Sequence, residues 1–280
     1  MVIPFIHRLV RRNLTSQGIA SKRVSIAGTS IHYYEACPEH PRDTLVLVHG
    51  LGTSTSTWTH ILPDLAREYH VIAPDLPGFG FSIPKDGFPV YSIDEYVAVL
   101  EQFLDNTLSG EFVLLGHSLG GWITMKYALR NPQRVNQLVL VNTAGIYYQG
   151  SEQLVDLFDI RSTKDTNRLL DRIWKRYPWY FRLLTPFVFE DLVRRKVPQI
   201  VKAIQKGDFL NADLSRFHMP VSVIWGKGDQ LLSSETLTIL SECLPARTIH
   251  IIEQSGHVPQ LEAPREFLTI VRKILEDRVL

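Results

Sequence analysis

The stretch Gly116-His117-Ser118-Leu119-Gly120-Gly121 decides how this chain is interpreted. Residues 111–115, mostly apolar, precede it and are typical of a buried strand, whereas residues 122–130 carry apolar side chains at helical spacing. A serine between small residues at a strand-to-helix junction occupies a tight, strained turn that exposes its hydroxyl. The backbone amides at the start of the helix would face a developing negative charge. We therefore interpret Ser118 as a candidate nucleophile, with the flanking glycines leaving room for the turn.

The composition limits the class of protein. A chain of 280 residues with 45% hydrophobic and 21% charged residues suits one large globular α/β domain, or such a domain with an insertion. The net charge of +1 lacks the basic excess of a nucleic-acid binder, so no nucleic-acid partner is expected. Cys37 and Cys243 do not make a disulfide framework. Neither a Cys/His cluster at ligand spacing nor a nucleotide-binding glycine motif occurs, so the sequence predicts no metal and no cofactor.

Short apolar runs alternate with helical patterns along most of the chain. Strands are predicted at residues 24–26, 31–35, 44–48, 70–73, 111–115, 137–142, 220–225 and 248–252. Helices are predicted at residues 58–68, 93–106, 122–130 and 264–278, the second with Ser92 as N-cap and Glu95 completing a capping box. This alternation indicates an α/β fold with a mainly parallel sheet flanked by helices.

The pattern changes over residues 147–217, where no strand is predicted and aromatic side chains are frequent among mixed charges. We interpret this segment as a helical cap inserted into a sheet domain made of residues 23–146 and 218–280. Because pocket walls are typically apolar, Trp174, Tyr177 and Phe187 of the cap, together with Val258, are predicted to line a substrate pocket. The other aromatic residues of the cap are expected to hold it together.

Residues 1–22 form a basic and apolar extension. Ile3, Phe5 and Leu9 alternate there with Arg8 and Arg12, and the first acidic residue of the chain is Glu35. The segment does not match a secretory signal cleanly, and it is compatible with an interfacial amphipathic helix, a transit peptide or a helix packed on its own domain. A weak contact with a membrane surface is therefore the partner that this segment would allow. The expected compartment is the cytoplasm, with membrane association left open.

A serine hydroxyl needs a neighbouring base, and that base needs an acid that fixes its tautomer. His257 follows a predicted strand within the turn Gln254-Ser255-Gly256-His257, and Asp229 follows the preceding predicted strand. Because sites in such sheets lie at the carboxyl ends of strands, these two side chains are expected near Ser118. Along the chain these candidates come in the order Ser, Asp, His, which is the order expected for this fold.

The chain resembles the α/β-hydrolase superfamily, in its capped lipase/esterase-like and C–C-hydrolase-like branch. Five segments carry the resemblance from about Val24 onward: HGLG at 49–52, DLPGFGFS at 75–82, GHSLGG at 116–121, GKGD at 226–229 and SGH at 255–257. The resemblance implies that Ser118 is the nucleophile, His257 the general base and acid, and Asp229 the orienting acid. It also implies an oxyanion hole made by the backbone N–H groups of Leu51 and Leu119.

Four further residues near these motifs have other expected roles. Family members can place the acid after the preceding strand, but Asn142 occupies that position, which favours Asp229. Asp75 resembles a structural turn residue that braces its loop. His117 is interpreted as a packed, hydrogen-bonded neighbour of the nucleophile, and His49 as a brace of the oxyanion loop.

The sequence thus predicts a serine hydrolase that cleaves small-molecule carboxylic esters with an apolar acyl group through an acyl-enzyme intermediate. The first alternative is a C–C bond hydrolase acting on a vinylogous diketone of the meta-cleavage type. That branch of the superfamily often has Asn where this chain has His117. The second alternative is a non-catalytic binding protein on the same fold, because a fold does not fix a function. The sequence leaves the oligomeric state open.

Overall fold

One mixed sheet organises the molecule. The computed structural model describes residues 2–26, 28–84 and 87–277. The eight strands run in the order β1-β2-β4-β3-β5-β6-β7-β8, with β1 and β2 antiparallel to their neighbours and the remaining strands parallel. They are β1 (Ala20–Ile26), β2 (Thr29–Ala36), β3 (Thr44–Val48), β4 (His70–Pro74), β5 (Phe112–His117), β6 (Val135–Val141), β7 (Val221–Gly226) and β8 (Arg247–Ile252).

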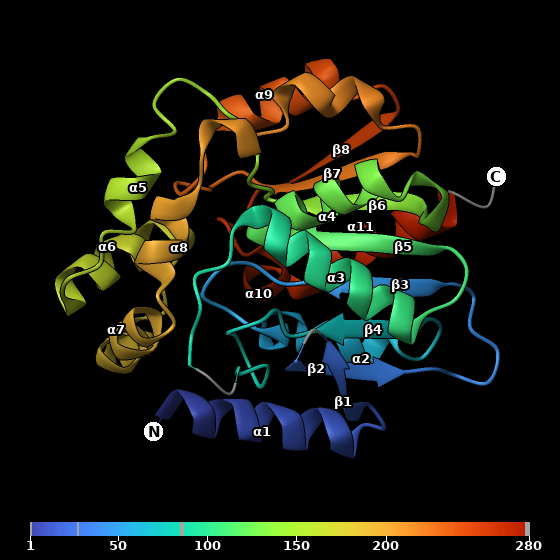
Figure 1. Ribbon diagram of the computed structural model, residues 1–280, viewed down its shortest axis with the longest axis horizontal. Helices are drawn as coiled ribbons and strands as arrows, with labels where there is room; N and C mark the ends of the chain where they lie inside the picture. The colour runs from blue at the N-terminus through green and yellow to red at the C-terminus, as the bar shows by residue number, and fades with distance from the viewer. Residues whose placement is uncertain (1, 27, 85–86, 278–280) are drawn as a thin grey trace.

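Helices cover both faces of this sheet and gather beside it (Figure 1). The α-helices are α1 (Val2–Ser16), α2 (Leu62–Leu65), α3 (Ile93–Thr107), α4 (Leu119–Arg130), α5 (Gln153–Leu157), α6 (Thr163–Ile173), α7 (Thr185–Arg194), α8 (Val197–Ala203), α9 (Ser234–Cys243), α10 (Pro259–Glu262) and α11 (Pro264–Glu276). The 3₁₀ helices are η1 (Thr55–Trp58), η2 (Pro132–Arg134), η3 (Trp179–Leu184), η4 (Lys206–Asp208) and η5 (Asn211–Arg216). No described helix is long and apolar enough to cross a membrane.

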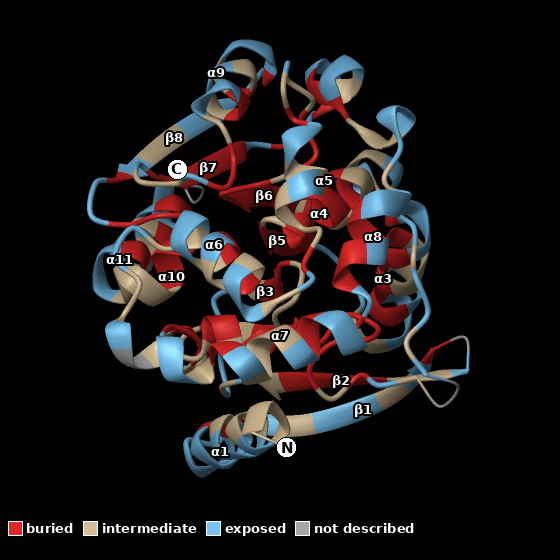
Figure 2. Ribbon diagram, turned by 90° about the vertical axis from the view of Figure 1, so that its left-hand side faces the viewer, coloured by how far each residue is buried: buried red, intermediate tan, exposed pale blue. Residues whose placement is uncertain are grey.

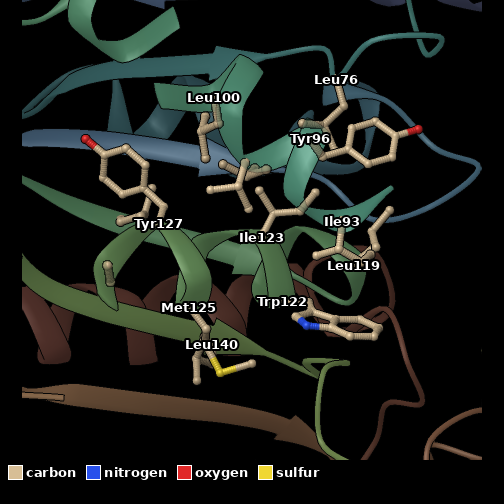
Figure 3. Close-up of a cluster of buried hydrophobic side chains, with 14 of the residues drawn as sticks. Leu76, Ile93, Tyr96, Leu100, Leu119, Trp122, Ile123, Met125, Tyr127 and Leu140 are labelled. Carbon is tan, nitrogen blue, oxygen red and sulfur yellow. The ribbon is translucent and has the colours of Figure 1, made fainter. Parts of the chain in front are cut away.

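The strands divide their side chains between two cores. In β3, Val46 and Val48 face the core under α3 and α4, whereas Leu45 and Leu47 face the core under α1, α2 and α11. This alternation follows from the two-residue repeat of a strand. Figure 3 shows the first core, where Leu100 of α3 lies opposite Ile123 of α4. The central strands are buried on both faces (Figure 2), which explains their nearly continuous apolar sequences.

Most predicted elements appear close to their predicted bounds. The strand at 44–48 is β3, and Ser92 and Glu95 form the expected capping box at the start of α3. The helix predicted at 58–68 is wrong, because the structure has η1 and the short α2 in its place. Pro63 lacks a backbone N–H and suits the first turn of a helix, so it starts α2 rather than continuing a longer one. The last residue of the helix predicted at 264–278, Arg278, lies outside the described residues.

Between β6 and β7 the chain forms a helical insertion, which we define as residues 153–216, from α5 to η5. Its helices α5 to α8 stand together at the left of Figure 1. The insertion carries no strand in its described residues, as the aromatic and mixed-charge pattern predicted. The N-terminal segment forms α1, which packs against β1 and α7.

Candidate active site

Ser118 occupies the junction between β5 and α4 in a backbone conformation that few non-glycine residues adopt. Its φ is 54° and its ψ is −119°. The surroundings hold this strain, because the Ser118 N–H donates to Val141 O at 3.0 Å and the Ser118 carbonyl accepts from Ala144 N at 3.1 Å. The sharp turn therefore has the geometry of a nucleophile elbow.

The glycines around Ser118 let the turn pack against the sheet. A Cβ atom at Gly116 would lie 2.5 Å from the carbonyl oxygen of Gly120. A Cβ atom at Gly120 would lie 2.4 Å from the carbonyl oxygens of Val48 and His49. Neither position has room for a side chain, so α4 approaches β3 and β5 only because these residues are glycines.

The predicted acid and base are joined by a hydrogen bond. The Nδ1–H group of His257 donates to Oδ2 of Asp229 at 2.8 Å, and both side chains are almost fully buried. This bond leaves the other ring nitrogen of neutral His257, Nε2, as an acceptor. Among the described residues no hydrogen bond is formed between this nitrogen and the Ser118 hydroxyl. Such contacts are often loose in unliganded sites and tighten around a substrate.

The carboxylate of Asp229 is fully hydrogen-bonded. Its Oδ1 accepts from the N–H groups of Leu231 at 2.8 Å and Leu232 at 3.0 Å. Its Oδ2 accepts from His257 and from Nδ2 of Asn142, at 2.7 Å. Asn142 occupies the position at which other members of the superfamily place the acid. Here its side chain does not act as the acid and instead holds Asp229 through this hydrogen bond. The sequence did not predict this role, because no residue near Asn142 in the chain indicates a hydrogen bond to Asp229, which follows the next strand.

The loop that carries His257 is tied to the helical insertion. The His257 N–H donates to Ile173 O at 2.7 Å. Glu262 links the same two segments, because its Oε1 accepts from Gly256 N at 2.6 Å and its Oε2 from Lys175 N at 2.9 Å. Burial raises the pKa of Glu262, although the backbone N–H groups oppose this shift. The segment at the end of α6, inside the insertion, thus helps to set the position of the candidate base.

The loop after β3 also lies against Ser118. A Cβ atom at Gly50 would lie 3.1 Å from Cβ of Ser118, so the backbone leading to Leu51 runs beside the hydroxyl. His49 braces this loop as predicted, since its Nδ1–H donates to Gly50 O at 2.8 Å and its Nε2 accepts from Leu76 N at 2.9 Å. Leu51 and Leu119 both border the cavity next to Ser118. Their suggested role as oxyanion donors stays a prediction.

Asp75 braces the loop after β4, as predicted. Its carboxylate accepts from His32 Nδ1 at 2.8 Å, from Thr55 N at 2.8 Å and from Phe81 N at 2.9 Å. Burial alone would raise the pKa of Asp75, but the bond and charge of His32, helped by His49 and the Phe81 N–H, lower it to about 2. Asp75 is therefore an ionised structural residue.

His117 is a buried, hydrogen-bonded neighbour of the nucleophile, as predicted. Its Nε2–H donates to the carbonyl oxygen of His257 at 2.8 Å, while its Nδ1 is buried without a partner. Burial holds the pKa of His117 well below its usual value, and the nearby rings of His257 and His49 lower it further. His117 is thus a neutral side chain that fixes the His257 loop.

A cavity of about 380 Å³ opens beside Ser118. Its walls come from the elbow helix, from the segment after β6, and from α5 and α8 of the insertion. They are largely apolar, and the residues that shape it include Leu119, Trp122, Leu154, Phe158, Ile204 and Phe209. This size and polarity are typical of a small-molecule pocket.

The four predicted pocket residues do not line this cavity, and their role in binding a substrate stays a prediction. Trp174 and Tyr177 follow the C-terminal end of α6 and pack on each other, with ring centroids 6.1 Å apart. Phe187 borders a groove against the start of α1, and Val258 is buried before α10. Aromatic composition alone does not tell which face of an insertion helix meets the core.

Trp122 is the pocket residue that the sequence could have indicated. It lies four residues after Ser118, which places it on the same face of α4. Its ring stacks on Phe209 at 4.9 Å, and its Nε1–H donates to Asp208 O at 3.0 Å. Phe209 belongs to the insertion, so this stack fastens the insertion to the core beside the cavity.

An open, mainly parallel sheet with a serine on a strained turn after its central strand defines the α/β-hydrolase fold. The chain belongs to the alpha/beta hydrolase fold family, whose sequence profile matches residues 43–210, more than half of the chain.

Individual relatives include a dienoate hydrolase and a lipase. The chain is 27% identical to 2-hydroxy-6-oxo-2,4-heptadienoate hydrolase of Pseudomonas putida, over 82% of this chain and 88% of that protein. It is 24% identical to Lipase 3 of a Moraxella species, over 92% of this chain and 85% of the lipase. Among solved structures, a bacterial membrane phospholipase A superposes with a TM-score of 0.84 at 26% identity, over 99% of this chain and 92% of that one.

Proposed function

We propose that the protein is a serine hydrolase that cleaves carboxylic esters with an apolar acyl group. The observation that carries this proposal is the position of Ser118 at an apolar cavity, next to the loop that presents the Asp229–His257 pair. The helical insertion would act as the cap that shapes the acyl site. The lipase and phospholipase relatives support ester cleavage.

In the proposed reaction His257 Nε2 takes the Ser118 proton as Oγ attacks the ester carbonyl. The negative oxygen that forms would accept from the N–H groups of Leu51 and Leu119, and loss of one such donor typically costs about 3 kcal/mol in the barrier. His257 then gives its proton to the leaving alcohol. Water, deprotonated by the same ring, releases the acid from Ser118.

A second candidate is hydrolysis of a C–C bond in a vinylogous diketone, which the Pseudomonas putida relative favours. The substrate of that relative carries a carboxylate, and Lys206 at the cavity offers a cation for such a group. However, Lys206 already lies over the Tyr147 ring at 5.3 Å, and the carboxylate of Glu152 borders the same cavity. The charge of Lys206 therefore has other partners than a substrate carboxylate. Ester hydrolysis is therefore the function that the geometry supports best.

The test is hydrolysis of p-nitrophenyl esters from short to long acyl chains, by wild type and Ser118→Ala in parallel. Turnover that disappears in Ser118→Ala supports the proposal. Cleavage of a dienoate substrate without ester turnover would move the assignment to the C–C hydrolase. If a fluorophosphonate probe also fails to label Ser118, the enzyme proposal is wrong and a binding role replaces it.

A further inference from the structure

The helix α1 has two opposite stripes of side chains. The inner stripe faces the domain: Leu14 is fully buried, Val10 packs on the second core, and His7 meets the Phe81 ring edge-on at 5.9 Å. The outer stripe consists of Phe5, Arg8, Leu9 and Arg12, which follow at intervals of three, one and three residues and so share one face of the helix. The domain therefore uses only one side of α1.

The outer stripe combines exposed apolar area with unpaired positive charge. Phe5 is 56% exposed and Leu9 is 50% exposed. Arg8 and Arg12 are also exposed, and within the described residues neither forms an ion pair with a carboxylate. The sequence of α1 contains no acidic residue that could satisfy them. Apolar side chains between free arginines on one helix face are typical of an interfacial helix.

The surface beside the start of α1 mixes apolar side chains with the charged residues Glu190, Asp191 and Arg194. The start of α1 lies beside α7, where Ile3 and Phe187 border the same groove. The 3₁₀ helix η3 leads directly into α7, and it exposes 77% of Trp179 and 72% of Leu183. Large hydrophobic residues are thus exposed on α1 and on the element that leads into its neighbour α7, and exposed apolar patches mark interaction sites.

We propose that the outer stripe of α1 docks the protein on the surface of an anionic phospholipid bilayer. Phe5 and Leu9 would enter the boundary between headgroups and acyl chains, and Arg8 and Arg12 would bind lipid phosphates. The helix would lie in the plane of the membrane surface. This inference is independent of the proposed ester hydrolysis, because it rests on α1 and the surface beside it and not on the site at Ser118.

Charge favours a bilayer over a second copy of the chain. Two outer stripes facing each other would bring the arginines of one copy near those of the other, with no carboxylate on either helix to pair with them. A bilayer with anionic headgroups supplies the missing negative charge over the whole length of the stripe.

The test is co-sedimentation with vesicles of phosphatidylcholine, either pure or mixed with phosphatidylglycerol, at low and high salt. We expect wild type to bind the mixed vesicles at low salt, and binding to weaken as salt screens the charges. Arg8→Gln with Arg12→Gln should lower the partition coefficient about twenty-five-fold, at about fivefold per arginine. Phe5→Ser with Leu9→Ser should also abolish most binding.

The matched control replaces Arg216 and Arg247 by Gln, which removes the same charge from exposed positions outside α1 and η3. It should bind as wild type does, and all variants should keep the circular dichroism spectrum and thermal transition of wild type. Equal binding by all variants would overturn the proposal, as would failure of wild type to bind mixed vesicles. A concentration-dependent dimer that only the α1 variants lose, without vesicle binding, would assign the stripe to self-association and also overturn it.

Discussion

Asn142 and His257 share one oxygen atom of Asp229. The amide Nδ2 of Asn142 lies 2.7 Å from Oδ2 of Asp229, and the same Oδ2 accepts the Nδ1–H of His257 at 2.8 Å. Asn142 itself is held by the Gly226 N–H, which donates to its Oδ1 at 3.0 Å. Asn142, in the loop after β6, therefore orients the carboxylate of Asp229, in the loop after β7, toward His257.

Removal of the Asn142 side chain should slow the reaction. We expect Asn142→Gly to lower kcat about ten- to a hundredfold with little change in KM, because one hydrogen bond to a charged group contributes about 1.5–3 kcal/mol and Asn142 does not touch the cavity. Glycine is the right replacement, since Asn142 has a φ of 39° that would strain alanine. Steady-state kinetics on a p-nitrophenyl ester measure the effect, and an unchanged kcat would refute the positioning role.

Glu262 should matter for catalysis although it is remote from Ser118 in the sequence. Glu262→Ala leaves the Gly256 and Lys175 N–H groups without their acceptor, so we expect a loss of about 2–4 kcal/mol in unfolding free energy and a lower kcat. Glu262→Gln keeps one acceptor oxygen and should retain more of both. Chemical denaturation and kinetics report the two effects. The exposed Glu266→Ala is the control, and an equal response from it would contradict the assignment.

Unfolding free energy should fall as the pH drops below about 6.5. Burial lowers the pKa of His49 and His117, so the unfolded chain binds protons there that the folded chain does not. Each histidine then removes up to about 1.4 kcal/mol per pH unit until its folded pKa is reached. Denaturation between pH 7 and 5 measures the slope. His117→Asn should flatten it, whereas the exposed His40→Asn should not; a slope unaffected by His117→Asn would count against this account.

The elbow should not tolerate a methyl group at Gly120. Gly120→Ala places a Cβ atom 2.4 Å from two backbone oxygens, which must move, so we expect a loss of at least about 3 kcal/mol of stability or failure to fold. Gly207→Ala is the matched control, because a Cβ atom there meets nothing within 4 Å. Thermal melting of both variants decides the point, and similar melting temperatures would show that the elbow is less tightly packed than the contacts indicate.

The preferred acyl-chain length should change when Phe158 is replaced and stay the same when Tyr177 is replaced. Phe158→Ala enlarges the cavity beside Ser118, so the preferred p-nitrophenyl ester should have a longer acyl chain. Tyr177→Ala changes an aromatic residue of the same insertion that packs away from the cavity, so the preference should stay as in wild type. The ratio of kcat/KM values across the ester series measures the preference. A shift caused by Tyr177→Ala alone would place the acyl site elsewhere.

The sequence by itself determined the strand and helix order and the local structure around Ser118. Strand β3, the capping box of α3 and the glycine turn depend on residues a few positions apart, so their patterns are readable along the chain. The position of His257 and Asp229 after late strands also followed, because parallel strands end at one edge of the sheet.

Only the tertiary structure decided which side chains meet across that edge. The Asn142–Asp229 bond joins residues 87 positions apart, and the bond from Lys175 N to Glu262 also spans 87 positions. The cavity walls depend on how the insertion helices are rotated against α4, which turned Phe158 inward and left Trp174 and Phe187 outside. Packing between distant segments sets that rotation, and neither helical spacing nor aromatic composition encodes it in one stretch of sequence.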